Sequence, residues 1–390
     1  MIISMIISLH IIILTAVLLV LALVTPLFSP FFRKVKVESV ETDETDSATH
    51  LPPVSIVLTD HDSSFHLKKV LPELLAQKYP GDFQVIVVID RSDSKSEDVL
   101  KLHSSDEHLY YTMLPETSRY LSRKKLGLTL GMRAAKYDWV LVTDVHSIPS
   151  SDHWLENMAR HCSDRVNMVL GMTLYGEDSP SYYRYEQLRT MLYFLRQAKE
   201  KTPFSSNQSL VMLRKSDFFS ASGFRGNLEF TRAEFEFLVN KFGKEGKCAL
   251  AIEPETWMQA IKPSSKRWRM RQLFALDAMK GMERTMGYTA LRRLDLWSMH
   301  TYNLLTLLAI IYSVVMLPTL NGIVLLAAAV LLWIISNVER AFIYRSALRY
   351  FNCISPLMAV LQDLTLGCRN IAMRLRYAFA DKNDFITHKL

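Results

Sequence analysis

The sequence predicts an α/β protein with a mainly parallel sheet and helices on both faces, together with an N-terminal transmembrane helix and a C-terminal transmembrane hairpin. Two observations lead to this prediction. From Leu51 onward, short β-branched runs alternate with amphipathic segments, which is the pattern of repeated βα units. Residues 2–30 and 300–338 contain no Lys, Arg, Asp or Glu, as expected of segments that cross a bilayer.

The first apolar stretch is expected to be a retained anchor. It exceeds the roughly 7–15 apolar residues of a signal-peptide core, and it lacks a basic start. The second stretch is too long for one span and carries Pro318 and Asn321-Gly322 near its middle. Because these residues favour turns, we expect a hairpin of two short spans, at 301–317 and 323–338.

Cations beside the apolar stretches predict the orientation, since cytoplasmic flanks are enriched in Lys and Arg. These cations are Arg33, Lys34, Lys36, Arg292, Arg293, Arg340 and Arg345. They place the intervening domain in the cytoplasm, in a multi-pass protein of the inner (cell) membrane. The net charge of +7 comes without a basic face interleaved with aromatic residues, so we expect attraction to the membrane surface and no nucleic-acid binding.

The composition divides the chain into five parts. We expect a transmembrane anchor at 1–30, a flexible acidic linker at 31–50, the α/β domain at 51–290, the hairpin at 300–338, and basic amphipathic interfacial helices with a tail at 339–390. The cysteines are too far apart for zinc-type pairs and are expected to be free, reduced thiols: Cys162, Cys248, Cys353 and Cys368.

Within the α/β domain, hydrophobic periodicity predicts the elements. The expected strands are 54–59, 84–89, 139–143 and 166–171, and the expected helices are 65–77, 94–102, 123–135 and 152–161. The part from 180 to 286 is less regular, with long helices near 182–199 and 232–242. We expect this part to cover the carboxyl edge of the sheet and to form one side of a cleft.

Two polar residues follow the most apolar of these strands. The run 139–143 ends on Asp144, and His146 comes two residues later. Ligands of open α/β sheets bind beyond the carboxyl ends of the strands, and residues at alternate positions can point the same way. An oxygen and an imidazole together suit Mn²⁺ or a similar ion. Alternatively, Asp144 caps a following helix and His146 lies on the surface.

Several segments occur in an order that resembles the family 2 glycosyltransferases, which are inverting, membrane-associated enzymes with a GT-A fold. These segments are residues 52–58, 74–80, 85–92, 124–131, 144–146, 207–214 with 222–224, and 264–268. The resemblance extends over residues 52–268. It implies a nucleotide-sugar donor, a divalent metal (Mn²⁺ or Mg²⁺), and a lipid-linked or glycan acceptor.

The resemblance also implies the donor-binding residues. Asp90 would contact the base, Lys124 the phosphates, and Asp144 with His146 the metal on the diphosphate. Each of the first two has a simpler interpretation. Asp90 suits an Asx-turn with Ser92, and an exposed lysine at a helix start is usually solvated.

For the chemistry, the resemblance implies that Glu234 is the catalytic base, that Arg267 meets the leaving diphosphate, and that Trp268 offers an aromatic face to the acceptor. We expect desolvation by Phe235 and Phe237 to raise the pKa of Glu234. Alternatively, Glu234 is an acid favoured by the helix dipole. The cations around Arg267 also suit a basic patch that faces the membrane: Lys262, Lys266, Arg269 and Arg271.

The sequence departs from the family pattern at three places. His146 replaces the second Asp of D-x-D, Ala233-Glu234 replaces Glu-Asp, and Ser264 replaces the Gln of Q-x-x-R-W. The leading hypothesis is a metal-dependent, membrane-bound glycosyltransferase that transfers a hexosyl-type sugar with inversion. The alternative is a catalytically inactive scaffold of the same fold in a glycan-assembly complex. The oligomeric state is left open.

Overall fold

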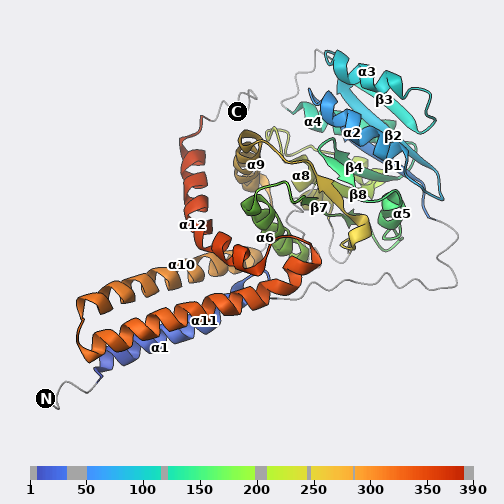
Figure 1. Ribbon diagram of the computed structural model, residues 1–390. Helices are drawn as coiled ribbons and strands as arrows, with labels where there is room; N and C mark the ends of the chain where they lie inside the picture. Colours follow the sequence, from blue (N-terminus) through green and yellow to red (C-terminus); the bar gives the residue numbers. More distant parts are fainter. Residues whose placement is uncertain are drawn as a thin grey trace, which may run out of the picture. The chain divides into compact units, whose positions relative to one another are not determined.

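The computed structural model describes residues 7–32, 51–115, 122–197, 209–243, 247–283 and 286–381 (Figure 1). The chain divides into two compact units, which are described separately below. The helical unit comprises residues 1–35 and 285–372, and the α/β unit comprises residues 36–284 and 373–390. Most of the expected linker, residues 33–50, lies outside the described residues, as does residue 207 at the start of one family-like segment.

The α/β unit is built on a seven-stranded sheet with the order β3-β2-β1-β4-β8-β6-β9. The antiparallel strand is β8, which pairs with β4 and β6, whereas the other neighbours run parallel. The strands are β1 (Val54–Thr59), β2 (Phe83–Asp90), β3 (Leu109–Leu114), β4 (Trp139–Asp144), β6 (Met168–Leu170), β8 (Leu210–Arg214) and β9 (Cys248–Leu250). The predicted mainly parallel α/β sheet is therefore confirmed.

Side chains alternate between the two faces of this sheet, and helices cover both faces. Ile56 and Leu58 of β1 pack in one apolar core with α2, α3 and α5, whereas Val57 packs in the other with α4, α7 and α8. The helices are α2 (Ser64–Leu75), α3 (Ser94–Leu102), α4 (Arg123–Ala134), α5 (Trp154–Ala159), α7 (Lys215–Ser220) and α8 (Glu234–Phe242).

Two glycines let α4 lie close to the sheet. A Cβ atom on Gly131 would stand 2.4 Å from Val57 Cγ1, and one on Gly127 would stand 2.9 Å from Thr59 Cγ2. Both glycines lie on the same side of the helix, one turn apart. The close packing holds the first turn of α4, which carries Arg123 and Lys124, beside the carboxyl end of β1.

A three-stranded sheet with the order β5-β10-β7 continues from the end of β4. Its strands are β5 (Ser147–Pro149), β7 (Thr173–Tyr175) and β10 (Met258–Ala260). The amide of Ile261 donates to the carbonyl of His146 at 2.7 Å, which fixes the chain after β10 against the end of β4. Helices α6 (Ser181–Gln197) and α9 (Ser265–Ala278) complete this part of the unit.

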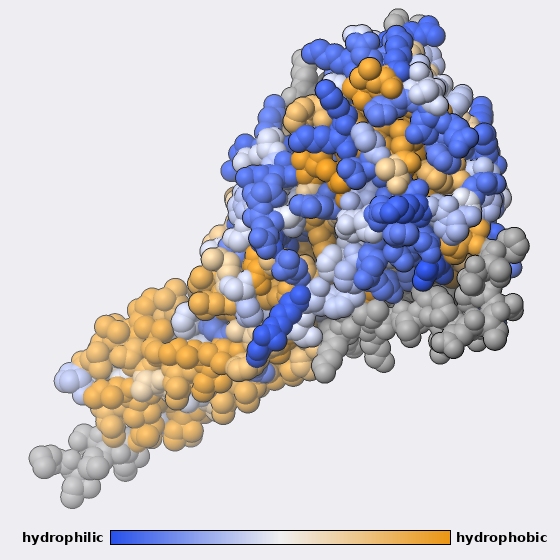
Figure 2. All heavy atoms as spheres, turned by 45° about the vertical axis from the view of Figure 1, so that its right-hand side comes forward, coloured by the Kyte–Doolittle hydropathy of each residue, from blue (hydrophilic) through white to orange (hydrophobic). Residues whose placement is uncertain are grey.

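The helical unit contains α1 (Leu9–Val24), a 3-10 turn (Thr25–Phe28), α10 (Met286–Val315), α11 (Leu320–Tyr350) and most of α12 (Pro356–Phe379). Three segments are long and apolar enough to cross a membrane: Leu9–Phe28, Thr289–Val315 and Leu320–Tyr350. Figure 2 shows that apolar side chains cover the visible face of these helices. The turn between α10 and α11 contains Pro318, as the sequence indicates.

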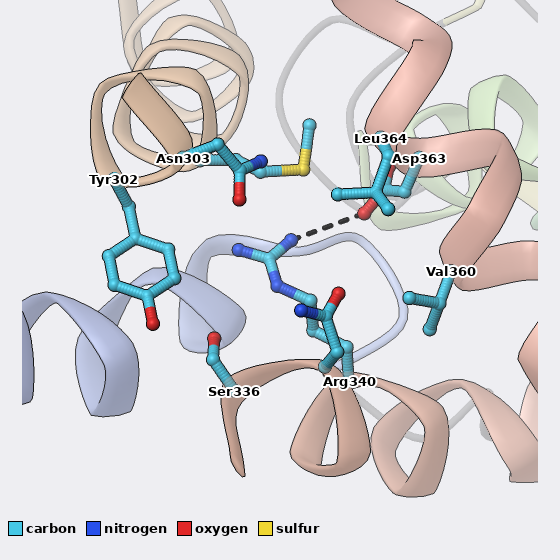
Figure 3. A pocket seen from close by; sticks show the side chains of 9 residues that line it. Tyr302, Asn303, Ser336, Arg340, Val360, Asp363 and Leu364 are labelled. Atoms are coloured by element: carbon cyan, nitrogen blue, oxygen red, sulfur yellow. Dashed lines mark hydrogen bonds and ion pairs between the residues drawn. The ribbon is translucent and has the colours of Figure 1, made fainter. Parts of the chain in front are cut away.

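The helices of the hairpin are longer than the sequence suggests. Residues 341–350, expected to begin a separate interfacial helix, continue α11, and α12 follows as a single helix. The reason is that Arg340 is not at a helix end but inside the unit, where it donates to Asp363 of α12 at 3.2 Å and to Thr25 at 3.0 Å. Figure 3 shows Arg340 pointing toward Asp363.

Candidate active site

Three acidic residues lie at the carboxyl ends of three neighbouring strands. Asp60 follows β1, Asp90 ends β2 and Asp144 ends β4. These strands are adjacent and parallel, and Thr59 of β1 lies opposite Val88 of β2 and Asp144 of β4. The three carboxylates therefore share one edge of the sheet, which is where such folds bind ligands.

At the end of β4, Asp144 and His146 form the pair that the sequence singled out. The Oδ1 atom of Asp144 accepts from the His146 amide at 3.0 Å and from the Ser147 hydroxyl at 3.2 Å. Burial favours a higher pKa for Asp144, but the charge of Lys124, a hydrogen bond from Ser209 and the charge of Arg271 help to hold the pKa below its ordinary value. Strand β5, not a helix, follows this pair, so the alternative in which Asp144 caps a helix is wrong.

The imidazole of His146 is suited to binding a metal. Its burial lowers the pKa to about 4, despite the nearby Asp144, so the ring is neutral at physiological pH. Its Nδ1 atom is buried and has no hydrogen-bond partner within the described residues. The described part of the chain has no cluster of three His, Cys, Asp or Glu side chains suited to a metal ion. A divalent ion held by Asp144 and His146 would need its other ligands from substrate or water.

A second histidine lies against His146. The rings of His66, on α2, and His146 are 4.7 Å apart and nearly perpendicular, with an interplanar angle of 88°. Burial lowers the pKa of His66, and Arg267 and Lys69 lower it further. Sequence reasoning missed His66, because its position in the first turn of an ordinary amphipathic helix gives no sign that it faces β4.

The candidate base, Glu234, is 5% exposed and pairs with a lysine. Its Oε1 atom forms an ion pair with Lys124 Nζ. Burial favours a higher pKa for Glu234, but the ion pair with Lys124 and the nearby Arg232 lower the pKa below its ordinary value. Our expectation of a raised pKa is therefore wrong in sign, because the sequence does not show that a lysine faces this carboxylate.

Glu234 is the first residue of α8, and the residue before it has an unusual backbone conformation. Ala233 has φ 68° and ψ 35°, in the left-handed region that non-glycine residues rarely adopt. Such a conformation costs on the order of 1–3 kcal/mol and tends to occur at functional sites. Ala233 occupies the position of the Glu in the family's Glu-Asp pair. The departure from the family pattern at this position therefore coincides with a strained backbone.

Helix α9 brings two arginines to the same edge. Arg267 Nη1 lies 3.5 Å from His146 Nε2. Arg271, one turn later, lies 3.4 Å from the Tyr175 hydroxyl, and the charges of Glu236 and Asp144 act on it. We had considered Arg271 only as part of a basic patch, because sequence alone does not show which side of α9 faces the sheet.

Trp268 has little surface to offer an acceptor. It is 7% exposed, and its ring stacks on Tyr183 with centroids 4.5 Å apart and an interplanar angle of 11°. Tyr182 packs edge-on against it at 5.5 Å. Of these three rings, Tyr182 is the half-buried one, so it presents more surface than Trp268.

Asp90 is held by two side chains that sequence reasoning missed. Arg123 Nε donates to its Oδ1 atom at 2.9 Å, and His61 Nδ1 contacts its Oδ2 atom. The backbone carbonyl of Asp90 accepts from the Asp93 amide at 3.0 Å. The carboxylate thus faces a guanidinium and an imidazole rather than the Asx-turn with Ser92 that we considered. Arg123 directly precedes Lys124, so the first turn of α4 supplies a cation to Asp90 and another to Glu234.

The site residues named from the sequence come together at one edge. Lys124 pairs with Glu234 and acts electrostatically on Asp144 and His146, and Arg267 contacts His146. Asp90 lies two strands from Asp144, across β1, and is joined to the group through Arg123. Trp268 belongs to the aromatic packing beneath α9.

Comparison with known proteins identifies the family to which this fold belongs. Residues 55–219 match the model of Glycosyl transferase family 2. The chain carries a family 2 glycosyltransferase domain. This domain contains β1, β2, β4 and β8 and the Asp90, Lys124, Asp144 and His146 positions. No curated protein matches the sequence.

Among solved structures, the chain is similar to the mannosyltransferase PcManGT from Pyrobaculum calidifontis, determined with GDP-Man and Mn²⁺. The TM-score is 0.51 at 14% identity, over 92% of this chain and 98% of that chain. Two further matches are TarS residues 1–349 from S. aureus in complex with UDP (TM-score 0.40, 13% identity, 63% and 70% covered) and glucosyl-3-phosphoglycerate synthase from Mycobacterium tuberculosis with phosphoglyceric acid (0.40, 11%, 60% and 82%). The GT-A fold predicted for the α/β domain is confirmed.

Proposed function

We propose that this protein is a membrane-bound glycosyltransferase that transfers a hexosyl-type sugar from a nucleotide-sugar donor to a lipid-linked or polysaccharide acceptor, with inversion. One observation carries the proposal. At the carboxyl edge of a family 2 domain, one ammonium group, that of Lys124, pairs with a buried carboxylate and acts on an Asp and His pair of metal-binding type. In this proposal, the base lies beside the pair that binds the donor.

On the donor side, Asp144 and His146 would hold Mn²⁺ or Mg²⁺. The ion would neutralise charge on the departing nucleoside diphosphate. Arg267 and Arg271 add two guanidinium groups, which pair well with phosphate oxygens. Asp90, fixed by Arg123 and His61, would contact the base of the nucleotide. PcManGT, which was determined with GDP-Man and Mn²⁺, supports this choice of ligands.

On the acceptor side, Glu234 would take the proton of the acceptor hydroxyl. The hydroxyl oxygen attacks the anomeric carbon from the face opposite the diphosphate, the bond to the diphosphate breaks, and the configuration inverts. Because the pKa of Glu234 is lowered in the free protein, its carboxylate is ionised and ready to accept a proton at neutral pH.

The three apolar segments support attachment to a membrane. We propose that the glycosyltransferase domain faces the cytoplasm at the inner membrane, because cations that favour that side lie near the ends of two of these segments: Arg292, Arg293 and Arg345. A lipid-linked acceptor suits an enzyme anchored in this way.

The test is a screen of UDP-, GDP- and other nucleotide sugars for transfer or hydrolysis by the purified full chain, with and without Mn²⁺. We expect Asp144→Asn and Glu234→Gln to lower turnover by about 10²–10⁴-fold. The controls are Asp98→Asn and Glu107→Gln, which change exposed acids elsewhere in the α/β unit.

Wild-type turnover in both site variants would show that the roles are wrongly assigned. Absence of any turnover of nucleotide sugars by the wild-type chain would instead favour the inactive scaffold.

A further inference from the structure

Lys124 stands between the two halves of the candidate site. Its ammonium group pairs with Oε1 of Glu234, and its charge also acts on Asp144 and His146. The side chain of Lys124 is 25% exposed, whereas that of Glu234 is 6% exposed. A ligand entering at Asp144 and His146 can therefore reach the cation more easily than the carboxylate.

The carboxylate of Glu234 is only half satisfied. Its Oε2 atom is buried and has no hydrogen-bond partner in the described part of the chain. The other charged groups that act on or near it are Lys125 of α4, Arg232 before α8, and Glu236 of α8. Within the described residues, Lys124 alone is close enough to form an ion pair with Glu234.

A bound donor would compete for this ammonium group. A diphosphate carries more negative charge than one carboxylate. Its oxygens would lie beside Asp144 and His146, which already lie within the electrostatic influence of the Lys124 ammonium group. An ammonium group is a compact charge on a flexible stem, so it can change partners with a small movement.

We propose that Lys124 is a positioning residue that exchanges partners: it holds Glu234 in the free protein and turns to the diphosphate when the donor binds, which releases Glu234 for the acceptor hydroxyl. This inference rests on the proposed function, since it requires a diphosphate at Asp144 and His146. It makes the base available only after the donor is in place.

The test measures binding of pyrophosphate, with Mn²⁺ present, to the full chain in detergent by calorimetry at one pH. Pyrophosphate has no base or sugar, so the result does not depend on which donor the enzyme uses. In the wild-type protein, Lys124 must leave Glu234 before it can bind the probe. Glu234→Gln removes the competing charge, and we expect binding to become roughly tenfold tighter, the size of an ordinary pairwise coupling.

Four further variants separate the ion pair from a general charge effect. Lys124→Met should bind the probe more weakly than wild type, and adding Glu234→Gln to it should give no further change. Glu229→Gln is the matched control, because it removes an exposed acid five residues before Glu234. It should tighten binding much less than Glu234→Gln. Lys136→Met, an exposed lysine just beyond the other end of α4, should bind as wild type does.

The exchange is overturned if Glu234→Gln binds no more tightly than wild type, if it tightens binding equally in the Lys124→Met background, or if Glu229→Gln has the same effect. If the wild-type chain binds neither pyrophosphate nor UDP or GDP with Mn²⁺, the proposed function itself fails. Binding by the wild type without the coupling would leave the proposed function standing and remove only the exchange.

Discussion

Among the described residues, the ion pairs Arg340–Asp363 and Lys124–Glu234 both contain a buried carboxylate, but they differ in how fully their polar atoms are bonded. In the helical unit, Arg340 and Asp363 are 4% and 2% exposed, and each has a second partner: Arg340 donates to Thr25 at 3.0 Å, and the Tyr344 hydroxyl donates to Asp363 at 2.6 Å. In the α/β unit, Lys124 is partly exposed and one oxygen of Glu234 has no partner among the described residues.

The difference indicates what each pair does. Removing one member of a fully bonded buried pair leaves a charge with no solvent to compensate it, so such a pair fixes the elements that it joins. The pair in the helical unit joins α11, α12 and the turn after α1. A pair with an open oxygen and an accessible cation can exchange partners at low cost. The pair in the glycosyltransferase domain therefore suits a reacting site.

A buried lysine next to Lys124 is held in a different way from both ion pairs. Lys125 is 1% exposed, and its ammonium group donates to the carbonyl oxygens of Asn227 and Phe230, both at 2.5 Å. It forms no ion pair in the part of the chain that the structure describes. Burial lowers its pKa to about 8. Neighbouring lysines on one helix thus serve different purposes.

The largest effect is expected in the helical unit. Arg340→Leu and Asp363→Leu should each lower the free energy of unfolding by about 3–5 kcal/mol, because each leaves the other charge buried and unpaired. Chemical unfolding of the full chain in detergent would measure this. The double variant should recover most of the loss, since no charge remains. Single variants that cost less than about 1 kcal/mol would contradict the fixed role of this pair.

Lys125 should make stability depend on pH in the alkaline range. Its folded-state pKa of about 8 lies below the ordinary 10.5, so the unfolded chain binds more protons between these values, and stability rises with pH across that window. The gain is about 3 kcal/mol at 1.36 kcal/mol per unit. In Lys125→Met this rise should be missing, while Lys136→Met should keep it. Equal slopes in all three proteins would refute the prediction.

Lys124 should set the acidic limit of activity. Glu234 must be ionised to accept a proton, and Lys124 opposes the effect of burial on its pKa. In Lys124→Met the pKa of Glu234 should rise, so kcat/KM should begin to fall at a higher pH than in wild type. The readout is the pH at which kcat/KM begins to fall. The maximum value of kcat/KM is not used, because removing a cation from the donor site also changes that value. An unshifted acidic limb would disprove the electrostatic role of Lys124.

The smallest effect is expected at Ala233. The left-handed backbone conformation of Ala233 destabilises a residue with a Cβ atom by about 1–2 kcal/mol, and glycine avoids this strain. Glycine, however, loses more conformational entropy on folding than alanine does. Ala233→Gly should therefore be neutral or stabilising by up to about 1 kcal/mol in unfolding measurements. Ala275→Gly, inside α9, is the control and should destabilise by about 0.5–1 kcal/mol. Equal losses in both variants would argue against strain at Ala233.

Local pattern was enough to find four of the five interior strands of the seven-stranded sheet, β1, β2, β4 and β6, whereas β8 was indicated only by the family resemblance of segment 207–214. Strand 54–59 and helix 94–102 match the structure to the residue, because a continuous apolar run and a helical apolar stripe leave few alternatives. Strand β3 was missed because it lies at the edge of the sheet, where its side chains are only partly buried and Tyr110 is 49% exposed. An edge strand does not give the apolar run that marks a central one.

For the candidate active site, too, the sequence predicted some features and the tertiary structure decided others. The order of residues along the chain was sufficient to place Asp90, Asp144 and His146 at strand ends, since a strand that ends on a polar residue presents it at the edge of the sheet. Which side chains face one another was decided by the tertiary structure alone. Lys124 and Glu234 are far apart in sequence, as are His66 and His146, and only the packing of α4, α8 and α2 on the sheet brings them together. The pKa of Glu234 follows from that contact, because its sign depends on a cation supplied by another helix.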